Sequence, residues 1–131
     1  MIVVDASAVV EILLASPKAA TVERETDGEQ THAPNLIGFE VLSVVTGKVR
    51  GTALSPQAGV EAMRRFERLE DTLELWPLID FMTERAVALR ENVSAYDACY
   101  VALAQMMPCP LITAEAKLGR AVADLVEVVV V

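Results

Sequence analysis

The sequence alternates between short runs of β-branched and aliphatic residues and longer stretches with apolar residues at helical spacing. Strands that alternate with helices predict parallel strands joined by right-handed crossovers. We predict strands over 2–4, 31–33, 73–78, 111–113 and 126–131, and helices over 6–15, 17–28, 35–49, 55–71, 81–90, 94–107 and 115–122. This order predicts an α/β fold, a three-layer α/β/α sandwich around a mostly parallel sheet.

Serine-proline pairs predict two of the helix starts. Ser16-Pro17 and Ser55-Pro56 each place a capping hydroxyl before a proline, which is tolerated at the first helical position because no N–H is needed there. The last strand, 126–131, has almost no polar alternation. That pattern predicts a strand buried on both faces of the sheet.

The length and composition favour one compact domain over residues 1–131. Apolar residues make up 53% of the chain and aromatic residues only 5%, so Val, Leu, Ala and Ile have to fill the interior. No apolar run approaches the about 18 residues that a membrane span needs, and Asp5 interrupts the apolar start that a signal peptide would have. We therefore expect a cytoplasmic protein without a membrane segment, in which Cys99 and Cys109 stay reduced.

The net charge is −8, which on its face argues against a polyanionic partner. The charges are unevenly distributed, however. From Lys48 to Arg90 the sequence has seven basic and seven acidic residues, so the excess acid lies elsewhere. RNA contact through one face is therefore compatible with the composition.

Two acidic side chains follow predicted strands directly. Asp5 comes after the first strand and Glu115 after the strand at 111–113. Ligands of open parallel sheets bind outside the carboxyl ends of the strands, so both residues lie where a site is expected. The alternative is structural, because an acid in the first turn of a helix is favoured by roughly 0.3 to 1 kcal/mol.

Two further acids occur on apolar helices. Glu40 has apolar neighbours at helical spacing, and an unpaired carboxylate in such a setting neutralises, finds a cation or binds a metal. The alternative for Glu40 is a salt bridge to Lys48 or to a distant arginine. Asp97 enters the core region on the apolar helix that begins near Ser94, although the same spacing also resembles a capping box.

Together the four carboxylates indicate a metal site. Carboxylates about 4 Å apart repel by up to about 4 kcal/mol per pair, and a divalent cation relieves that repulsion. A ligand set of oxygens without His or Cys favours Mg²⁺ or Mn²⁺ over zinc.

The ordered segments 3–8, 34–42, 94–98 and 111–115 resemble the motifs of PIN-domain proteins, and VapC-type toxins most closely. This resemblance covers essentially the whole chain. It implies that Asp5, Glu40 and Asp97 bind the metal, with the Ser7 hydroxyl supporting the first motif. Thr113 matches the family pattern and could hydrogen-bond the cluster. Glu115 stands where the family usually has Asp, so its carboxylate would bind the metal directly or through water.

The resemblance further implies an endoribonuclease that uses metal ions to cut RNA, a homodimer, and a cognate antitoxin that blocks the site. Two alternatives remain open. One is a PIN-like fold that has lost catalysis and serves as a binding module, which Glu115 supports. The other is a receiver-like Mg²⁺-binding signalling domain, which fits less well because Asp5 lacks the acidic neighbour that such domains need.

Overall fold

The five strands form one parallel sheet in the order β3-β2-β1-β4-β5, in a computed structural model that describes every residue from Met1 to Val131. The predicted α/β class and the predicted alternation of strands and helices are confirmed. The elements are β1 (Ile2–Val4), α1 (Ala6–Leu13), α2 (Ala19–Thr26), β2 (Thr31–Pro34), α3 (Ile37–Arg50), α4 (Pro56–Glu70), β3 (Glu74–Trp76), α5 (Asp80–Ala88), α6 (Ala95–Met106), β4 (Leu111–Thr113), α7 (Ala116–Val122) and β5 (Val128–Val130).

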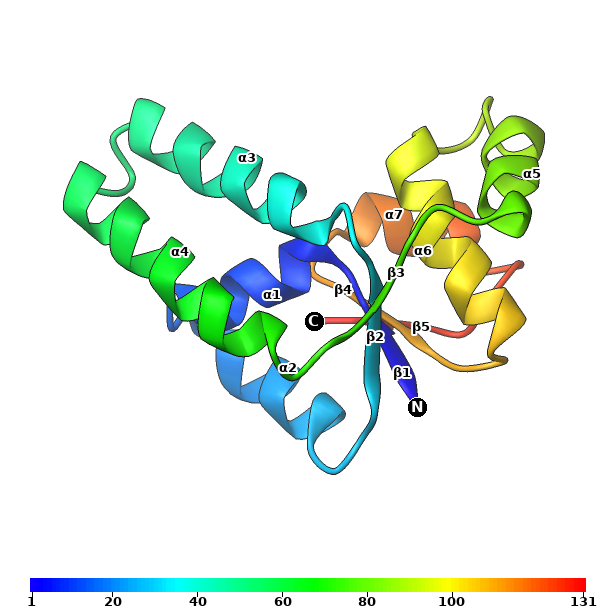
Figure 1. Cartoon of the computed structure of the whole chain (residues 1–131), viewed down its shortest axis with the longest axis horizontal. Coiled ribbons are helices and arrows are strands. Elements are labelled where there is room, and N and C mark those ends of the chain that lie inside the picture. Colours follow the sequence, from blue (N-terminus) through cyan, green and yellow to red (C-terminus); the bar gives the residue numbers. More distant parts are fainter.

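The helices cover both faces of the sheet (Figure 1). Helices α1 to α4 lie on one side, and α5 to α7 lie on the other. Helices α3 and α4 pack against each other as a long antiparallel pair that extends away from the sheet. The molecule thus has the three layers that the alternation predicts.

The strand order reverses between β1, the central strand, and its neighbour β4. From β1 the chain moves outward on one side to β2 and β3, then returns to β4 on the other side of β1 and continues to β5. The register pairs Val3 with His32 of β2 and with Leu111 of β4. In open parallel sheets, such a switch point leaves a crevice at the carboxyl ends of the strands, which is where ligands bind.

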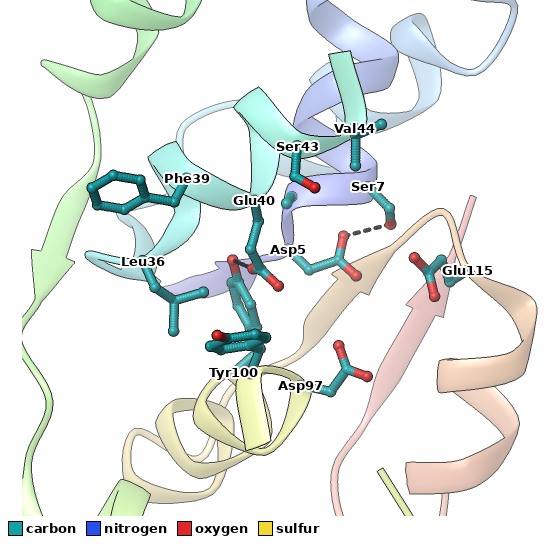
Figure 2. Close-up of a pocket in the computed structure, with 12 residues that line it drawn as sticks. Asp5, Ser7, Leu36, Phe39, Glu40, Ser43, Val44, Asp97, Tyr100 and Glu115 are labelled. Carbon is teal, nitrogen blue, oxygen red and sulfur yellow. Dashed lines mark hydrogen bonds between the residues drawn. The ribbon is translucent and has the colours of Figure 1, made fainter. Parts of the chain in front are cut away.

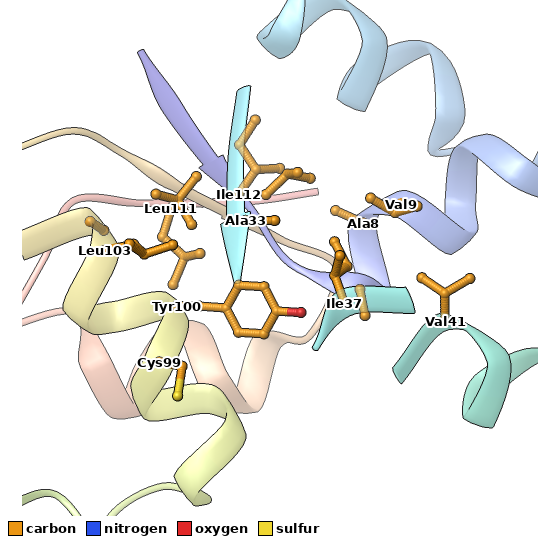
Figure 3. Packing of buried hydrophobic residues seen from close by; sticks show 14 of the residues in the cluster. Ala8, Val9, Ala33, Ile37, Val41, Cys99, Tyr100, Leu103, Leu111 and Ile112 are labelled. Atoms are coloured by element: carbon orange, nitrogen blue, oxygen red, sulfur yellow. The ribbon is translucent and has the colours of Figure 1, made fainter. Parts of the chain in front are cut away.

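The core is aliphatic, as the composition predicts, and it lies between the sheet and both helical layers. Val3, Val9, Ile37, Leu103 and Ile112 have no exposed surface. Figure 3 shows the ring of Tyr100 projecting from α6 into this cluster, with its hydroxyl directed toward Ile37 at the start of α3. The hydroxyl therefore lies at the edge of the core, at the end of the sheet where the switch point is.

Local capping explains several helix boundaries. The hydroxyl of Ser55 accepts a hydrogen bond from the backbone N–H of Ala58, and Pro56 occupies the first position of α4, as predicted. Ser16 does not cap α2. Its hydroxyl accepts from the N–H of Lys18 in a turn, and the helix begins only at Ala19.

The prediction for the last strand is wrong in one respect. β5 is not buried on both faces, and it forms an edge of the sheet that pairs only with β4. Val128 and Val129 are half-buried, and Val130 is 47% exposed. The absence of polar alternation in this strand therefore does not report burial on both sides.

Two further expectations concern the state of the cysteines and the absence of a membrane segment. Cys99 and Cys109 are both buried and unpaired, as small hydrophobic residues of the interior. None of the seven helices combines the length and the apolar character needed to cross a lipid bilayer.

Candidate active site

Asp5 lies at the end of β1 and is the most buried of the acidic residues, with 5% of its surface exposed. It is also the N-cap of α1, since its Oδ1 accepts a hydrogen bond of 2.9 Å from the N–H of Ala8. The structural and functional interpretations of Asp5 therefore coincide. The cap fixes the carboxylate at the carboxyl end of a central strand.

Ser7 and Thr113 hold the Asp5 carboxylate from both sides. The Ser7 hydroxyl donates to Oδ1 over 2.6 Å, and the Thr113 hydroxyl donates to Oδ2 over 2.5 Å. Each hydroxyl also accepts a backbone N–H, Ser7 from Ala114 and Thr113 from Glu115. This network ties the ends of β1 and β4 together across the switch point.

Glu40 lies in the first turn of α3 and is half-buried. Its Oε2 accepts a hydrogen bond of 2.5 Å from the hydroxyl of Tyr100 on α6. No cation lies within salt-bridge distance of Glu40, so the alternative of an ion pair with Lys48 or a distant arginine is wrong. The carboxylate is instead supported by a neutral donor.

Asp97 lies in the first turn of α6, and Glu115 immediately precedes α7. The Ser94 hydroxyl accepts from the N–H of Asp97, which is half of the predicted capping box. Asp97 makes no return bond to the Ser94 backbone, and its carboxylate is free to face the pocket. Glu115 occupies the N-cap position of α7 but makes no side-chain cap, and it is exposed.

The four acids come together around one pocket of about 480 Å³ at the switch point. Figure 2 shows Glu40 above, Asp5 in the middle, Asp97 below and Glu115 to one side, each on a different element. Leu36 and Val44 of the α3 segment add an apolar wall. No lysine or arginine lines this pocket.

The electrostatics of the pocket disfavour negative charge. Burial raises the pKa of Asp5, while the hydrogen bonds from Ser7 and Thr113 lower it in part. Burial also raises the pKa of Glu40, opposed by the Tyr100 hydroxyl and reinforced by the charges of the other acids. The pKa of Glu115 is raised by burial and by its acidic neighbours, and lowered by Lys117. The acids repel one another, and no lysine or arginine lines the pocket to compensate their negative charge.

The donor set fits a hard divalent cation. The pocket offers carboxylate and hydroxyl oxygens and no His or Cys, which is the chemistry that Mg²⁺ and Mn²⁺ prefer. The side chains do not already form a closed cage, since no three acids converge closely enough to hold an ion as they stand.

Sequence reasoning missed Tyr100 and the aromatic pocket residues Phe39 and Tyr96. Tyr100 follows Asp97 by three residues, so both lie on one face of α6. That spacing was the available signal. Phe39 and Tyr96 carry no local signal beyond their position directly before Glu40 and Asp97.

The fold has close counterparts among solved structures. A toxin-antitoxin complex from Klebsiella pneumoniae superposes with a TM-score of 0.68 at 21% identity, covering 98% of this chain and 96% of that one. VapC20 of Mycobacterium tuberculosis, described as a sarcin-ricin loop cleaving toxin, gives a TM-score of 0.67 at 17% identity, covering 92% and 95%. The fold class is thus the PIN-like α/β fold.

Sequence comparisons narrow the class further. Residues 2–123 match the PIN domain. Ribonuclease VapC12 of Mycobacterium tuberculosis is 38% identical over 120 residues, covering 92% of this chain and 91% of that protein. Ribonuclease VapC9 of the same species is 36% identical over 119 residues, covering 91% and 89%. The chain therefore belongs to the PIN-domain family, within the group of VapC ribonucleases. This membership excludes the receiver-like alternative.

Proposed function

We propose that the chain is a metal-dependent endoribonuclease, the toxin of a type II toxin–antitoxin pair, which hydrolyses RNA phosphodiester bonds with Mg²⁺ or Mn²⁺. The observation that carries this proposal is the convergence of Asp5, Glu40, Asp97 and Glu115 on one pocket without a cation of its own. The family is typically metal-dependent, and the relatives named above are ribonucleases.

Asp5, Glu40 and Asp97 would hold the ion, with Glu115 at the exposed side of the pocket. A divalent cation supplies a lowered pKa for attacking water and stabilises charge on the phosphate. Ser7 and Thr113 keep the Asp5 carboxylate oriented, since each donates to a different oxygen. Tyr100 orients Glu40, and its own raised pKa keeps the hydroxyl protonated as a donor.

We further propose a cognate antitoxin and a homodimer as the protein partners, and the cytoplasm as the place of action. The antitoxin is supported by the likeness of the fold to chains solved in toxin-antitoxin complexes. The homodimer rests on the family resemblance. Exposed apolar side chains such as Leu78 and Val87 are compatible with surfaces covered by partners.

A catalytically inactive binding module is the second candidate. Glu115 favours it, because this residue is longer than the family's Asp and is exposed without a hydrogen-bonded anchor for its carboxylate.

A cleavage assay separates the two candidates. Purified protein is incubated with total cellular RNA in Mg²⁺, Mn²⁺ or chelator, and products are mapped. We expect cleavage with either ion, none in chelator, and none by Asp5→Asn or Asp97→Asn, which remove charge but little volume. Asp124→Asn removes an exposed acid outside the pocket and serves as the matched control.

Cleavage retained by folded Asp5→Asn would rule out the assigned site. No metal-dependent cleavage by the unaltered chain would leave the binding module as the function.

A further inference from the structure

The only exposed aromatic residues of the chain lie at the acidic pocket. Of its three Phe, two Tyr and one Trp, only Phe39 and Tyr96 are exposed, with 79% and 62% of their surface accessible. Both line the pocket, and each directly precedes one of its acids in the sequence. In Figure 2 the Phe39 ring projects from α3 on the side away from the carboxylates of Glu40 and Asp5, whereas Tyr96 lies on α6.

These two rings contribute little to the fold. Neither belongs to the buried core cluster or packs against it, and neither pairs with another aromatic ring. Large aromatic side chains normally bury most of their area, so exposing two at one site costs free energy that the fold does not recover. Their position therefore points to contact with a ligand.

The charge of the pocket restricts how RNA can be held there. Four carboxylates and no lysine or arginine line it, so the side chains themselves offer a polyanion no attraction between charges, and only a bound cation would. Two cations, Arg90 and Lys117, line an adjoining pocket that shares Asp97 and Glu115 with the first. Stacking of a base on an aromatic face does not depend on charge, and every base has such a face.

We propose that Phe39 and Tyr96 are specificity-determining residues that stack an unpaired RNA base beside the bond to be cut. The proposal rests on the ribonuclease function proposed above. With the base on the aromatic side of the acids, the RNA backbone passes the carboxylates and reaches Arg90 and Lys117 in the adjoining pocket. A base within a duplex cannot reach the rings without leaving its stack, so the pair selects unpaired nucleotides.

The test compares steady-state cleavage of a short single-stranded RNA by Phe39→Leu, Tyr96→Leu and Tyr96→Phe. Leucine keeps apolar volume but removes the ring. We expect KM to rise about 5- to 150-fold for either leucine variant, the range for loss of one stacked base, with kcat little changed. Tyr96→Phe keeps the ring, so its KM should lie much nearer to that of the unaltered chain than to that of Tyr96→Leu.

Leu42→Ala is the matched control, because Leu42 is 43% exposed on the same helix as Phe39 but does not line the pocket. A second set of reactions uses RNAs with one abasic nucleotide at successive positions around the cut. An abasic nucleotide at the stacked position should raise KM for the unaltered chain. It should raise KM little further for the leucine variants, because they have already lost the ring on which the base stacks.

Two results would overturn the inference while leaving the proposed function intact. The first is cleavage by the unaltered chain with no change of KM in Phe39→Leu and Tyr96→Leu. The second is a loss of activity that follows dissociation of a dimer in light scattering, without any effect of the abasic nucleotide. That outcome would assign the rings to a protein interface. Absence of metal-dependent cleavage by the unaltered chain instead contradicts the proposed function itself.

Discussion

Tyr100 links the hydrophobic core to the acidic pocket in a single side chain. Its ring is almost fully buried, and its hydroxyl donates to Glu40 at the pocket wall. A buried Tyr hydroxyl needs a polar partner, and here the partner is a carboxylate. The same contact orients Glu40 and favours its ionised form, because a hydrogen bond to a charged acceptor lowers the pKa of that acid.

Tyr100→Phe is predicted to shift the pH dependence of cleavage. Removing the hydroxyl takes away the contact that lowers the pKa of Glu40, while burial continues to raise it. Higher pH is then needed to ionise Glu40, so the acidic limb of the kcat/KM profile moves upward by about one pH unit, the size of a partly exposed charged hydrogen bond. Tyr96→Phe removes a hydroxyl that makes no such bond and should leave the limb in place. An unchanged limb in Tyr100→Phe would show that Glu40 does not limit the rate.

Asp5→Asn is predicted to stabilise the metal-free protein at neutral pH. The raised pKa of Asp5 means that the folded state binds a proton more tightly than the unfolded state does. Below the ordinary value of 3.8 both states are protonated and no penalty exists. Between that value and the folded pKa, the ionised form becomes unfavourable in the fold, and the free energy of unfolding falls by about 1.4 kcal/mol for each pH unit.

Thermal melts in chelator between about pH 4 and about pH 8 test this expectation. The variant should exceed the unaltered chain by roughly 3 to 6 °C at pH 7 and by much less near pH 4. Saturating Mg²⁺ should close the gap by stabilising the folded unaltered chain, because a ligand that binds only the folded state raises its stability. A variant that melts below the unaltered chain at pH 7 in chelator would contradict the expectation.

At the scale of elements, a glycine sets how closely α7 packs on the edge strand β5. A Cβ added at Gly119 would lie 2.5 Å from Cγ2 of Val130 and 3.6 Å from Cγ1 of Val128. Val side chains are stiff at χ1 and cannot easily turn aside. Glycine therefore lets α7 approach the strand and cover its apolar residues, which partly compensates for the exposed position of β5.

Gly119→Ala is predicted to lower the free energy of unfolding by about 1 kcal/mol or more, since overpacking of about 1 to 3 kcal/mol exceeds the gain in helix propensity. Urea unfolding measures the change. Gly47→Ala is the matched control on α3, where an added Cβ has no neighbour within 4 Å, and it should stabilise by about 0.5 to 1 kcal/mol. Combining Gly119→Ala with Val130→Ala should recover much of the loss. Additive effects in that double variant would show that the contact is not the cause.

Local signals in the sequence predicted where helices and strands lie better than they predicted how these elements are packed and buried. Ser55 caps α4, because its backbone is extended and its hydroxyl accepts the N–H of Ala58. The same serine-proline pair at Ser16 forms a turn instead, and α2 begins only at Ala19. Both pairs read alike locally, and packing decides between them. The apolar run at β5 predicted a strand correctly and its burial wrongly, because strand order depends on long-range pairing that no local pattern encodes.

At the scale of the whole molecule, the alternation of elements predicted the layers, and strand ends predicted where Asp5 and Glu115 would lie. The structure also brings Glu40 and Asp97 to the same pocket, from helices on opposite faces of the sheet. That convergence follows from the switch point between β1 and β4, which the sequence does not state directly. Tyr100 had a sequence signal in its spacing from Asp97, but its contact with Glu40 and the exposure of the two rings required side-chain geometry.

The charge distribution of the whole molecule predicts weakly salt-dependent RNA binding. The net charge is −8, and no basic residue lines the acidic pocket. Near the cut, RNA phosphates can therefore be neutralised, and their counterions released, only by cations such as Arg90 and Lys117 in the adjoining pocket. Each phosphate neutralised contributes about −0.7 to the slope of log affinity against log salt for single strands, so two contacts give about −1 to −2.

Binding of a fluorescent single-stranded RNA, measured by anisotropy in the Asp5→Asn background to keep the RNA intact, gives this slope. Lys117→Gln should weaken binding and reduce the slope by about 0.7, because one phosphate contact is lost. Lys48→Gln removes an exposed charge from α3, outside both pockets, and should change neither quantity. A slope steeper than about −4, or one that responds to Lys48 and not to Lys117, would place the RNA on a different and more basic face of the molecule.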